Sequence, residues 1–339
     1  MQQNWIRTPG DLLDSNGVLI QKGYSTEAIL TYNRDSIKAR PWRIKEWDFY
    51  QVSNNDFCLQ LTIGHVSYAG SVSVKLFEFA TGRHYEVTQM LVLPFNSLRM
   101  PLSADEGDLT VDRKNMFMQF QVFEGGRKLI CRATGKQLPK MELEIELSQP
   151  DKTSIVMATP FDEDPSHFYY NHKINSMPAS GFVRADGREY RFEPESAFGL
   201  LDWGRGVWPF SHEWFWGNGS CYIEGKRFGF NIGHGFGNTS NATENILFYD
   251  GTPHKLGQVH YNLSAGGYMS RKQITSEDGR FEMEFMPIYD QQTATKLLFI
   301  DNKCHQLFGT FHGKAVLDDG KVLEINNMVA FIEHAVNHW

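Results

Sequence analysis

The sequence predicts an all-β protein in which two antiparallel barrels, or strongly curved sheets, pack together with few short helices. Three observations support this prediction. Aromatic residues make up 14% of the 339 residues, and aromatic side chains favour strands. Apolar and polar residues alternate with a period of two in several segments. Acid–glycine pairs, which suit tight hairpin turns, recur through the second half of the chain.

The clearest alternation lies between Met141 and Leu147, where apolar residues alternate with three glutamates. This pattern predicts a strand with one buried and one charged face. Two further apolar runs flank the turn residues Glu124 to Arg127, which predicts a hairpin. The segment from Leu59 to Phe79 predicts two strands that are interrupted near Gly70.

Five acid–glycine pairs in the second half are each flanked by strand-like sequence and predict a succession of hairpins. They are Asp186-Gly187, Glu224-Gly225, Asp250-Gly251, Asp278-Gly279 and Asp319-Gly320. Such a meander loses its exposed edges when it closes into a barrel. Helix signals are weak: Ser25 to Tyr32 could form a capped turn or two, and the tail from Met328 to His338 could be a strand or a short helix.

Strand-rich sequence gives way to a loop-like stretch after Ser148-Gln-Pro-Asp-Lys152. We therefore expect two units, one at residues 1–150 and one at residues 151–339, the second carrying the densest aromatic motif. The length fits two domains or one large β unit.

Composition excludes several classes of function. The net charge is -7 and the pI is about 6.0, without the clustered basic surface of a nucleic-acid-binding protein. The basic run from Lys38 to Lys45 is expected to be a solvated connector. We expect no secretory signal, no transmembrane segment and a cytoplasmic location. The four cysteines form no CxxC pair, which predicts reduced thiols and no disulfide framework.

The densest motif runs from Leu201 to Asn218 and contains four of the eight tryptophans. If Glu224-Gly225 is a two-residue hairpin loop, Trp216 pairs with Gly233, Trp214 with Gly235 and Asn218 with Asn231. One strand face then carries His212, Trp214, Trp216, Arg227 and Asn231, and the other carries an ordinary phenylalanine-rich core. The first face is typical of a ligand cavity, in which apolar walls hold a few polar groups.

Candidate acid–base residues are Asp202, His212, His234 and Glu244. Asp202 and Arg205 lie three apart between glycines, so a salt bridge that fixes a bend and a functional group that faces a cavity are both open interpretations. His234 is either a general base or a core histidine with satisfied hydrogen bonds. Its glycine-rich surroundings lack the strand–turn–helix context of a dinucleotide site.

Candidate ligand-binding residues combine aromatic walls with a few polar anchors. They are Trp203, Arg205, Trp208, Trp214, Trp216, Asn231, Tyr170 and Lys173. Tyr170 and Lys173 belong to a second aromatic run, Phe168 to Lys173, which is either a ligand contact or a loop packed on the barrel. We expect no cofactor and no metal: His334 and His338 are four apart but lack further ligands.

Several runs resemble one known family. Arg43 to Tyr50, Phe168 to Asn175, Leu201 to Trp208, and Glu333-His334 with Trp339 are similar to the bacterial domain of unknown function 2804 family over nearly the whole chain. The D-W-G-R-G-x-W run is the most specific. A more distant likeness links the chain to the carotenoid 1,2-hydratase and lipocalin-type Diels–Alderase group. This likeness implies two lipocalin-like barrels with a ligand cavity, but no catalytic residue transfers from it.

Three functions remain open from the sequence. The first is binding of a hydrophobic or amphipathic small molecule with a cofactor-independent acid–base reaction of lyase, hydratase or isomerase type. The second is a non-catalytic carrier or sensor of a lipid-like ligand. The third is a structural or interaction protein whose barrels are filled by aromatic side chains. Of the three, an enzyme needs two titratable side chains that converge on open space. The sequence leaves the oligomeric state open.

Overall fold

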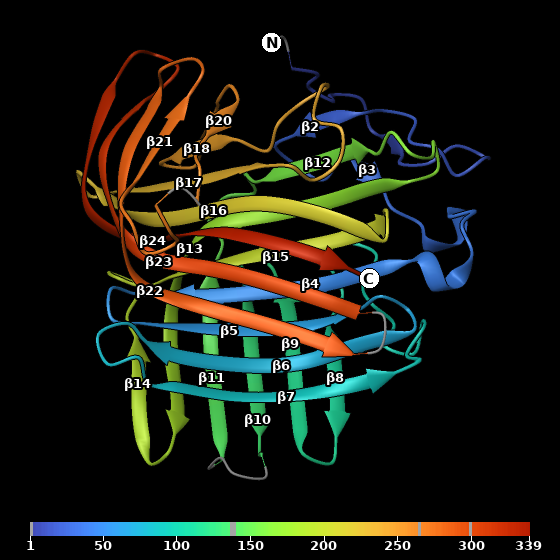
Figure 1. Cartoon of the computed structure of the whole chain (residues 1–339), viewed down its shortest axis with the longest axis horizontal. Coiled ribbons are helices and arrows are strands. Elements are labelled where there is room, and N and C mark those ends of the chain that lie inside the picture. Colours follow the sequence, from blue (N-terminus) through green and yellow to red (C-terminus); the bar gives the residue numbers. More distant parts are fainter. Residues whose placement is uncertain (1–2, 136–139, 264–265, 298–299) are drawn as a thin grey trace.

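The computed structural model describes residues 3–135, 140–263, 266–297 and 300–339. Its regular structure is almost entirely β-strand, and it forms two large curled antiparallel sheets (Figure 1). Within the described residues the helices are two single 3-10 turns, η1 (Arg34–Ser36) and η2 (Pro41–Arg43). A short parallel pair joins β1 (Gly10–Asp11) and β3 (Leu30–Thr31). The all-β prediction is therefore confirmed.

The first sheet has thirteen strands, and its main path runs in the order β7-β6-β5-β4-β15-β13-β11-β10-β9-β8. β12 and β2 extend it beside β13, and β14 also pairs with β13. The strands are β2 (Gly23–Ser25), β4 (Lys45–Ser53), β5 (Phe57–His65), β6 (Ala69–Glu78), β7 (His84–Val92), β8 (Leu109–Arg113), β9 (Met116–Phe123), β10 (Gly126–Ala133), β11 (Met141–Ser148), β12 (Ile155–Pro160), β13 (Phe168–Ala185), β14 (Arg188–Phe192) and β15 (Phe198–Val207).

The 18-residue strand β13 allows this sheet to curl over its own core. Its first part pairs with β12 and β15, and its last part pairs with β11 and β14. The register shifts between Ile174 and Met177, where Ser176 has a φ of 55°, and such bulges bend a strand. In Figure 1, β4 to β7 run across β8 to β11. The rings of Tyr50 and Phe120 meet between these two arms, with centroids 4.7 Å apart.

The second sheet has nine strands in the order β19-β18-β17-β16-β24-β23-β22-β21-β20. Its three longest strands carry the sheet across the molecule and then curve upward in Figure 1. The strands are β16 (Ser211–Ile223), β17 (Lys226–His234), β18 (Ile246–Tyr249), β19 (Thr252–Lys255), β20 (Val259–His260), β21 (Lys272–Ser276), β22 (Phe281–Leu297), β23 (Ile300–Val316) and β24 (Val322–His338).

Local patterns in the sequence agree with most of these strands. The strand predicted from Met141 is β11, with buried apolar residues on one face. The predicted hairpins at Asp186-Gly187, Glu224-Gly225 and Asp250-Gly251 all form, and both residues of each turn have positive φ. The predicted pairs Trp216–Gly233 and Asn218–Asn231 are confirmed in the register of β16 and β17.

The helical turn expected from Ser25 to Tyr32 is wrong. Ser25 ends β2 and Leu30 begins β3, with a bend at Thr26 and Glu27 between them. The Ser25 hydroxyl donates to the Glu27 carbonyl instead of capping a helix. Leu30 and Tyr32 are buried on either side of an exposed Thr31, so the alternation that buries apolar residues outweighs the weak helix propensity. The tail forms strand β24.

The chain changes from the first sheet to the second between Val207 and Ser211. Strands β12 to β15, which follow residue 150, pair within the first sheet. The division at residues 150 and 151 thus falls inside the sequence of one sheet, and we propose the two units as residues up to Val207 and residues from Ser211 onward. None of the helices in the described part of the chain has the length and apolarity to cross a membrane.

The two sheets meet through a layer of aromatic and aliphatic side chains. The first sheet contributes Phe49, Phe77 and Leu200, and the second contributes Phe308 and Phe331. This layer is separate from the core that each sheet encloses. The polar residues of the candidate site lie in the same space between the sheets.

Candidate functional site

Alternation along β13 and β15 directs one set of polar side chains at the second sheet. Lys173 pairs with Asp202 and Asn171 pairs with Gly204 across these strands, so Lys173, Asn171 and Asp202 share one face. The neighbouring strand β4 places Trp47 opposite Gly204. A Cβ at Gly204 would lie 2.5 Å from the Trp47 indole, so the glycine makes room for that ring.

Asp202 is buried and held by two donors from the first sheet. The Asn171 amide donates to Asp202 Oδ1 at 2.5 Å, and the Trp47 indole N–H donates to Oδ2 at 3.3 Å. Burial raises the pKa of Asp202 above its ordinary value, although the nearby charge of Lys173 opposes this shift. The carboxyl is thus poised to hold a proton more readily than an exposed aspartate.

Lys173 connects the two sheets through a buried ion pair. Its ammonium donates to Glu244 Oε2 and lies 4.5 Å from the centroid of the Trp216 ring. The Asn231 amide donates to the same Glu244 oxygen at 2.9 Å, and the Trp216 N–H donates to Asn231 Oδ1 at 2.8 Å. Each polar group thus has a partner, as a charged pair in a dry environment requires.

Glu333, on β24, is a third carboxyl in the space between the sheets. The Trp214 indole N–H donates to Oε1 at 2.7 Å, and the Gln306 amide donates to Oε2 at 3.1 Å. Burial is the main cause that raises the pKa of Glu333 from 4.5 to about 7, with a further contribution from the charge of Asp202. Since a general acid–base group works best with a pKa near the working pH, Glu333 suits proton transfer.

A chain of amides leads from Glu333 toward a hollow between the sheets. The Gln60 amide donates to Gln306 Oε1 at 2.5 Å and to Gln51 Oε1 at 3.0 Å. Gln51 lines the hollow, together with uncharged side chains and backbone of both sheets: Ser53, Asn54, Asn55, Ser196, Phe198, Gly199, Leu200, Asn218, Gly219, Ser220, Val329, Ala330 and Phe331. The hollow is therefore lined by neutral hydrogen-bonding groups and apolar side chains.

At the opposite end of this layer, an aromatic cluster surrounds His212. Its ring stacks on Trp214 at 5.7 Å and meets the Trp208 and Trp339 rings edge-on at 6.2 and 4.7 Å. Burial lowers the pKa of His212 to about 3, so the imidazole is neutral near pH 7. Lys45 lies against the same rings and donates to the Trp339 carbonyl at 2.6 Å.

Three predicted ligand-binding residues lie on the opposite face of the first sheet, inside its own core. Trp203 and Tyr170 pack edge-on at 5.8 Å, and the Tyr170 hydroxyl donates to the Leu30 carbonyl. Arg205 Nη2 donates to Asp48 Oδ1 at 2.8 Å, so of the two open interpretations of Asp202 and Arg205 the salt bridge between them does not form. β15 is extended through this motif, and residues three apart on a strand point to opposite faces.

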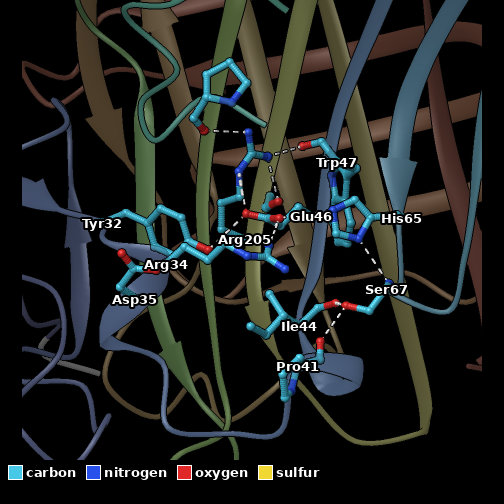
Figure 2. A network of polar contacts seen from close by, with 12 residues as sticks. Tyr32, Arg34, Asp35, Pro41, Ile44, Glu46, Trp47, His65, Ser67 and Arg205 are labelled. Atoms are coloured by element: carbon cyan, nitrogen blue, oxygen red, sulfur yellow. Dashed lines mark hydrogen bonds and ion pairs between the residues drawn. The ribbon is translucent and has the colours of Figure 1, made fainter. Parts of the chain in front are cut away.

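Figure 2 shows Arg205 within a buried ionic network at one end of this core. Glu46 contacts Arg34 and lies 3.1 Å from His65 Nε2 and 3.7 Å from Arg205 Nε. Burial alone would raise the pKa of Glu46, but the adjacent His65 side chain and the charges of Arg205 and Arg34 hold it at about 2. The network thus keeps Glu46 ionised. It also links β4, β5 and β15 through Glu46, His65 and Arg205.

His234 is also separated from the residues between the sheets. Its ring stacks on Phe215 at 4.5 Å, on the face of β16 that belongs to the second core. Of the predicted site residues, the structure therefore brings together Asp202, Glu244, Lys173, Asn231, Trp214 and Trp216, with Trp208 and His212 beside them. Trp203, Arg205, Tyr170 and His234 lie elsewhere.

The predicted site residues do not include Glu333, Gln306, Asn171 or Trp47. Glu333 lies in a segment for which strand and helix were both open, so its face was undefined until the pairing of β24 with β16 was known. Lys45 ends the run expected to be a solvated connector, yet it is buried. The alternation Lys45, Trp47, Phe49 would have been the signal for that strand face.

Within the described residues, His, Cys, Asp and Glu side chains form no group of three or more that is arranged to hold a metal ion. The four cysteines are free thiols, and Cys58 and Cys131 are fully buried. Burial raises the pKa of Cys221 and Cys131 to about 12, so neither is an activated thiolate.

Solved structures show where this fold recurs. A candidate AttH protein of Nitrosomonas europaea is 14% identical, with a TM-score of 0.55 over 90% of this chain and 96% of that one. Kievitone hydratase of Nectria haematococca is 10% identical, with a TM-score of 0.53 over 98% of each chain. At this identity the likeness shows a common fold.

No curated protein is similar enough in sequence to count as a relative. The family model does extend over the chain: it matches residues 3–339, from the first described residue to the end of β24 and Trp339. The chain therefore belongs to the family of the domain of unknown function DUF2804.

Proposed function

We propose that the protein binds a hydrophobic or amphipathic small molecule between its two sheets and transfers protons to and from it without a cofactor. The reaction would be of lyase, hydratase or isomerase type. Glu333 carries this proposal, because its buried carboxyl has a pKa raised to about 7. At neutral pH such a group is present in both protonation states and can act as either acid or base.

Asp202 and Glu333 form the proposed pair of proton-transfer groups. Burial raises the pKa of both carboxyls, and the charge of Asp202 contributes to the shift at Glu333. Titratable groups whose pKa values are shifted by burial and by each other are candidates for acid–base roles. Trp214 and Trp216 would shape the ligand site, and the Lys173–Glu244 pair would anchor a polar group of the ligand.

The fold gives limited support to the reaction class. Kievitone hydratase has the same two-sheet architecture at 10% identity, and a hydratase adds the elements of water, a proton and a hydroxyl group, across a double bond. Because one fold hosts many functions, the residues of this chain carry the proposal and the neighbour's name only motivates the assay.

A second candidate function is a non-catalytic carrier or sensor of a lipid-like ligand; the hollow between the sheets has a volume of about 30 Å³, so it would have to open to admit one. Its lining of amides, serines and apolar side chains offers hydrogen bonds without a charged catalytic group. A carrier needs such a site but does not need proton transfer at Glu333.

The test is proton exchange into the bound ligand in deuterated water. Purified protein is first extracted and analysed by mass spectrometry for bound compounds; fatty acids, isoprenoids and polyphenols serve as ligands if extraction yields none. Lyase, hydratase and isomerase steps move a proton between solvent and substrate carbon, so turnover adds deuterium to the ligand. We expect Glu333→Gln to abolish this exchange while binding remains.

Glu324→Gln is the matched control, because Glu324 lies exposed on the same strand. Deuterium exchange that persists unchanged in Glu333→Gln would reject the catalytic role of Glu333. Binding without exchange in the wild-type protein would support the carrier instead. Absence of binding to every compound would reject both functions.

A further inference from the structure

A second cluster of titratable side chains lies on the other face of β24, away from Glu333. Neighbouring residues on a strand point to opposite faces, so His334 faces the rim of the second core while Glu333 faces the first sheet. His334 pairs with Phe215 across β16 and β24, and the two rings stack at 4.3 Å with an interplanar angle of 4°. This stacking fixes the plane of the imidazole.

Each ring nitrogen of His334 lies within hydrogen-bonding distance of one side-chain oxygen. The Tyr268 hydroxyl lies 2.8 Å from Nδ1, and Glu213 Oε1 lies 2.6 Å from Nε2. These distances fall within the range of about 2.6–3.2 Å that a nucleophile, its base and an orienting third group require. The order hydroxyl, imidazole, carboxylate is that of a nucleophilic triad with a phenol as its hydroxyl.

A second histidine fixes the ring of Tyr268. The rings of Tyr268 and His305 stack at 3.7 Å with an interplanar angle of 7°. Asp290 Oδ2 lies 2.9 Å from His305 Nδ1 and holds that ring in place. His305 and Asp290 are therefore positioning residues, which keep the Tyr268 oxygen directed at His334.

The cluster is open enough to react but adds little to stability. Tyr268 is half-buried, and the Glu213 side chain is 53% exposed. Because a solvent-exposed ion pair contributes little to stability, a structural role explains the alignment of three groups poorly. A reactive role requires both the alignment and the access to solvent.

We propose that Tyr268, His334 and Glu213 form a second reactive centre, in which the Tyr268 oxygen attacks the carbonyl of an ester or other acyl donor. A bond forms between Tyr268 Oη and the acyl carbon, and the bond from that carbon to the leaving group breaks. The phenolic proton passes to His334 Nδ1 and then to the leaving oxygen. The products are an acylated tyrosine and the free alcohol, so no oxidant, reductant or metal is consumed.

Burial is the main cause that raises the pKa of Tyr268, and the charge of Asp290 acts in the same direction. A free phenolate is therefore scarce near neutral pH. The proton must leave while the new bond forms, and this makes the reaction depend on His334 as general base. A tyrosine without such a base would react more slowly, even with a similar exposure.

The test uses 4-nitrophenyl acetate as the acyl donor and the full chain as the protein. Nitrophenolate release gives the overall rate, and peptide mass spectrometry gives the acetylation of each tyrosine over time. Tyr222 is the internal control: it is 39% exposed, and its hydroxyl donates to the Pro194 carbonyl at 3.1 Å. We expect Tyr268 to be acetylated at least about tenfold faster than Tyr222, since general-base catalysis contributes about 10²–10⁴-fold.

Variants separate a reactive centre from a merely accessible tyrosine. Tyr268→Phe retains the stacked ring and should lose the fast acetylation, and His334→Gln should reduce the rate at Tyr268 to that of Tyr222. Glu213→Gln should lower the rate several-fold, and its exposed position makes it the deciding variant if His334→Gln fails to fold. Equal rates at Tyr268 and Tyr222 in the wild-type protein, or an unchanged rate in Glu213→Gln and His334→Gln, would overturn the proposal.

Discussion

At the scale of single residues, the ion pair between Lys173 and Glu244 links the two sheets across a largely buried space. Lys173 has a side chain that is 5% exposed, and its partner Glu244 is 19% exposed. Breaking such a pair from one side leaves the other charge in a dry environment. Removing one member of the pair is therefore expected to destabilise the fold more than removing both.

This gives a prediction for a double-mutant cycle. Lys173→Met should lower the free energy of unfolding by about 3–5 kcal/mol, because Glu244 loses its counter-ion. Adding Glu244→Gln to Lys173→Met should restore a large part of this loss, because no uncompensated charge remains. Urea unfolding of Lys173→Met, Glu244→Gln, the double variant and the wild type measures the coupling. Strictly additive losses of unfolding free energy would mean that Lys173 and Glu244 do not stabilise each other.

Glu333 makes stability depend on pH. Its pKa is raised in the folded protein from 4.5 to about 7, so the folded state binds the proton more tightly than the unfolded state. The stabilising contribution is fully present below about pH 4.5 and is lost as pH rises through about 7. At about 1.4 kcal/mol per pKa unit, the loss is on the order of 3 kcal/mol.

We therefore predict that Glu333→Gln becomes more stable relative to the wild type as pH rises from 5 to 8. The difference in unfolding free energy should change by up to about 3 kcal/mol in that window. Glu324→Gln, at an exposed position of the same strand, should show no such trend. Urea unfolding at several pH values checks this, and parallel curves for Glu333→Gln and the wild type would contradict it.

At the scale of the elements, the site depends on a strand with three glycines, β15. Gly204 leaves space for the Trp47 indole, whose N–H reaches Asp202. The bulge in β13 has a comparable role at the other side of the interface. There Ser176 Oγ lies 2.9 Å from Ser220 Oγ of β16, and Asn175 accepts a hydrogen bond from Asn218.

Gly204→Ala should displace the Trp47 indole, because the new Cβ would lie 2.5 Å from the ring. Overpacking of this kind costs about 1–3 kcal/mol, and the Trp47–Asp202 hydrogen bond would be lost. Gly10→Ala is the matched control in a strand, since an added Cβ there meets no atom within 4 Å. Thermal unfolding should separate the two variants, and equal melting temperatures would show that Trp47 adjusts freely.

These elements also show what the sequence could and could not reveal. The turn residues Glu224-Gly225 define the register of β16 and β17, so the pairing of Trp216 with Gly233 was predictable. The same local rules left a salt bridge between Asp202 and Arg205 open, because the glycines suggested a bend where β15 stays extended. The position of Glu333 could not be predicted from the sequence, because it depends on a pairing with β16 more than one hundred residues away.

At the scale of the whole molecule, each sheet encloses its own core and a third layer joins them. Phe331 belongs to the joining layer and is 1% exposed, whereas Phe281 is fully buried in the second core. Across this layer the ring of Phe77 in the first sheet meets that of Phe308 in the second, with centroids 5.1 Å apart. Because this layer includes the candidate site, the two halves should unfold together in the wild-type protein.

Phe331→Ala should therefore weaken the coupling between the halves and split one calorimetric transition into two. Phe281→Ala removes a ring of the same size from the second core, and truncation of a buried phenylalanine costs about 3–5 kcal/mol at either position. The unfolding transition of Phe281→Ala should move to lower temperature and remain single, because the joining layer is intact in this variant. Two transitions already present in the wild-type protein would show that the layer does not couple the sheets.

The protonation of Glu333 is the property on which the proposed chemistry rests. The direct measurement is an NMR titration of the side-chain carboxyl carbons in protein labelled with ¹³C-glutamate, with Glu333→Gln to assign the resonance. We predict a carboxyl that titrates near pH 7, well above the ordinary glutamate range of about 4.3, and that is absent from Glu333→Gln. A Glu333 resonance that titrates between pH 4 and 5 would contradict the buried acid–base role of this residue.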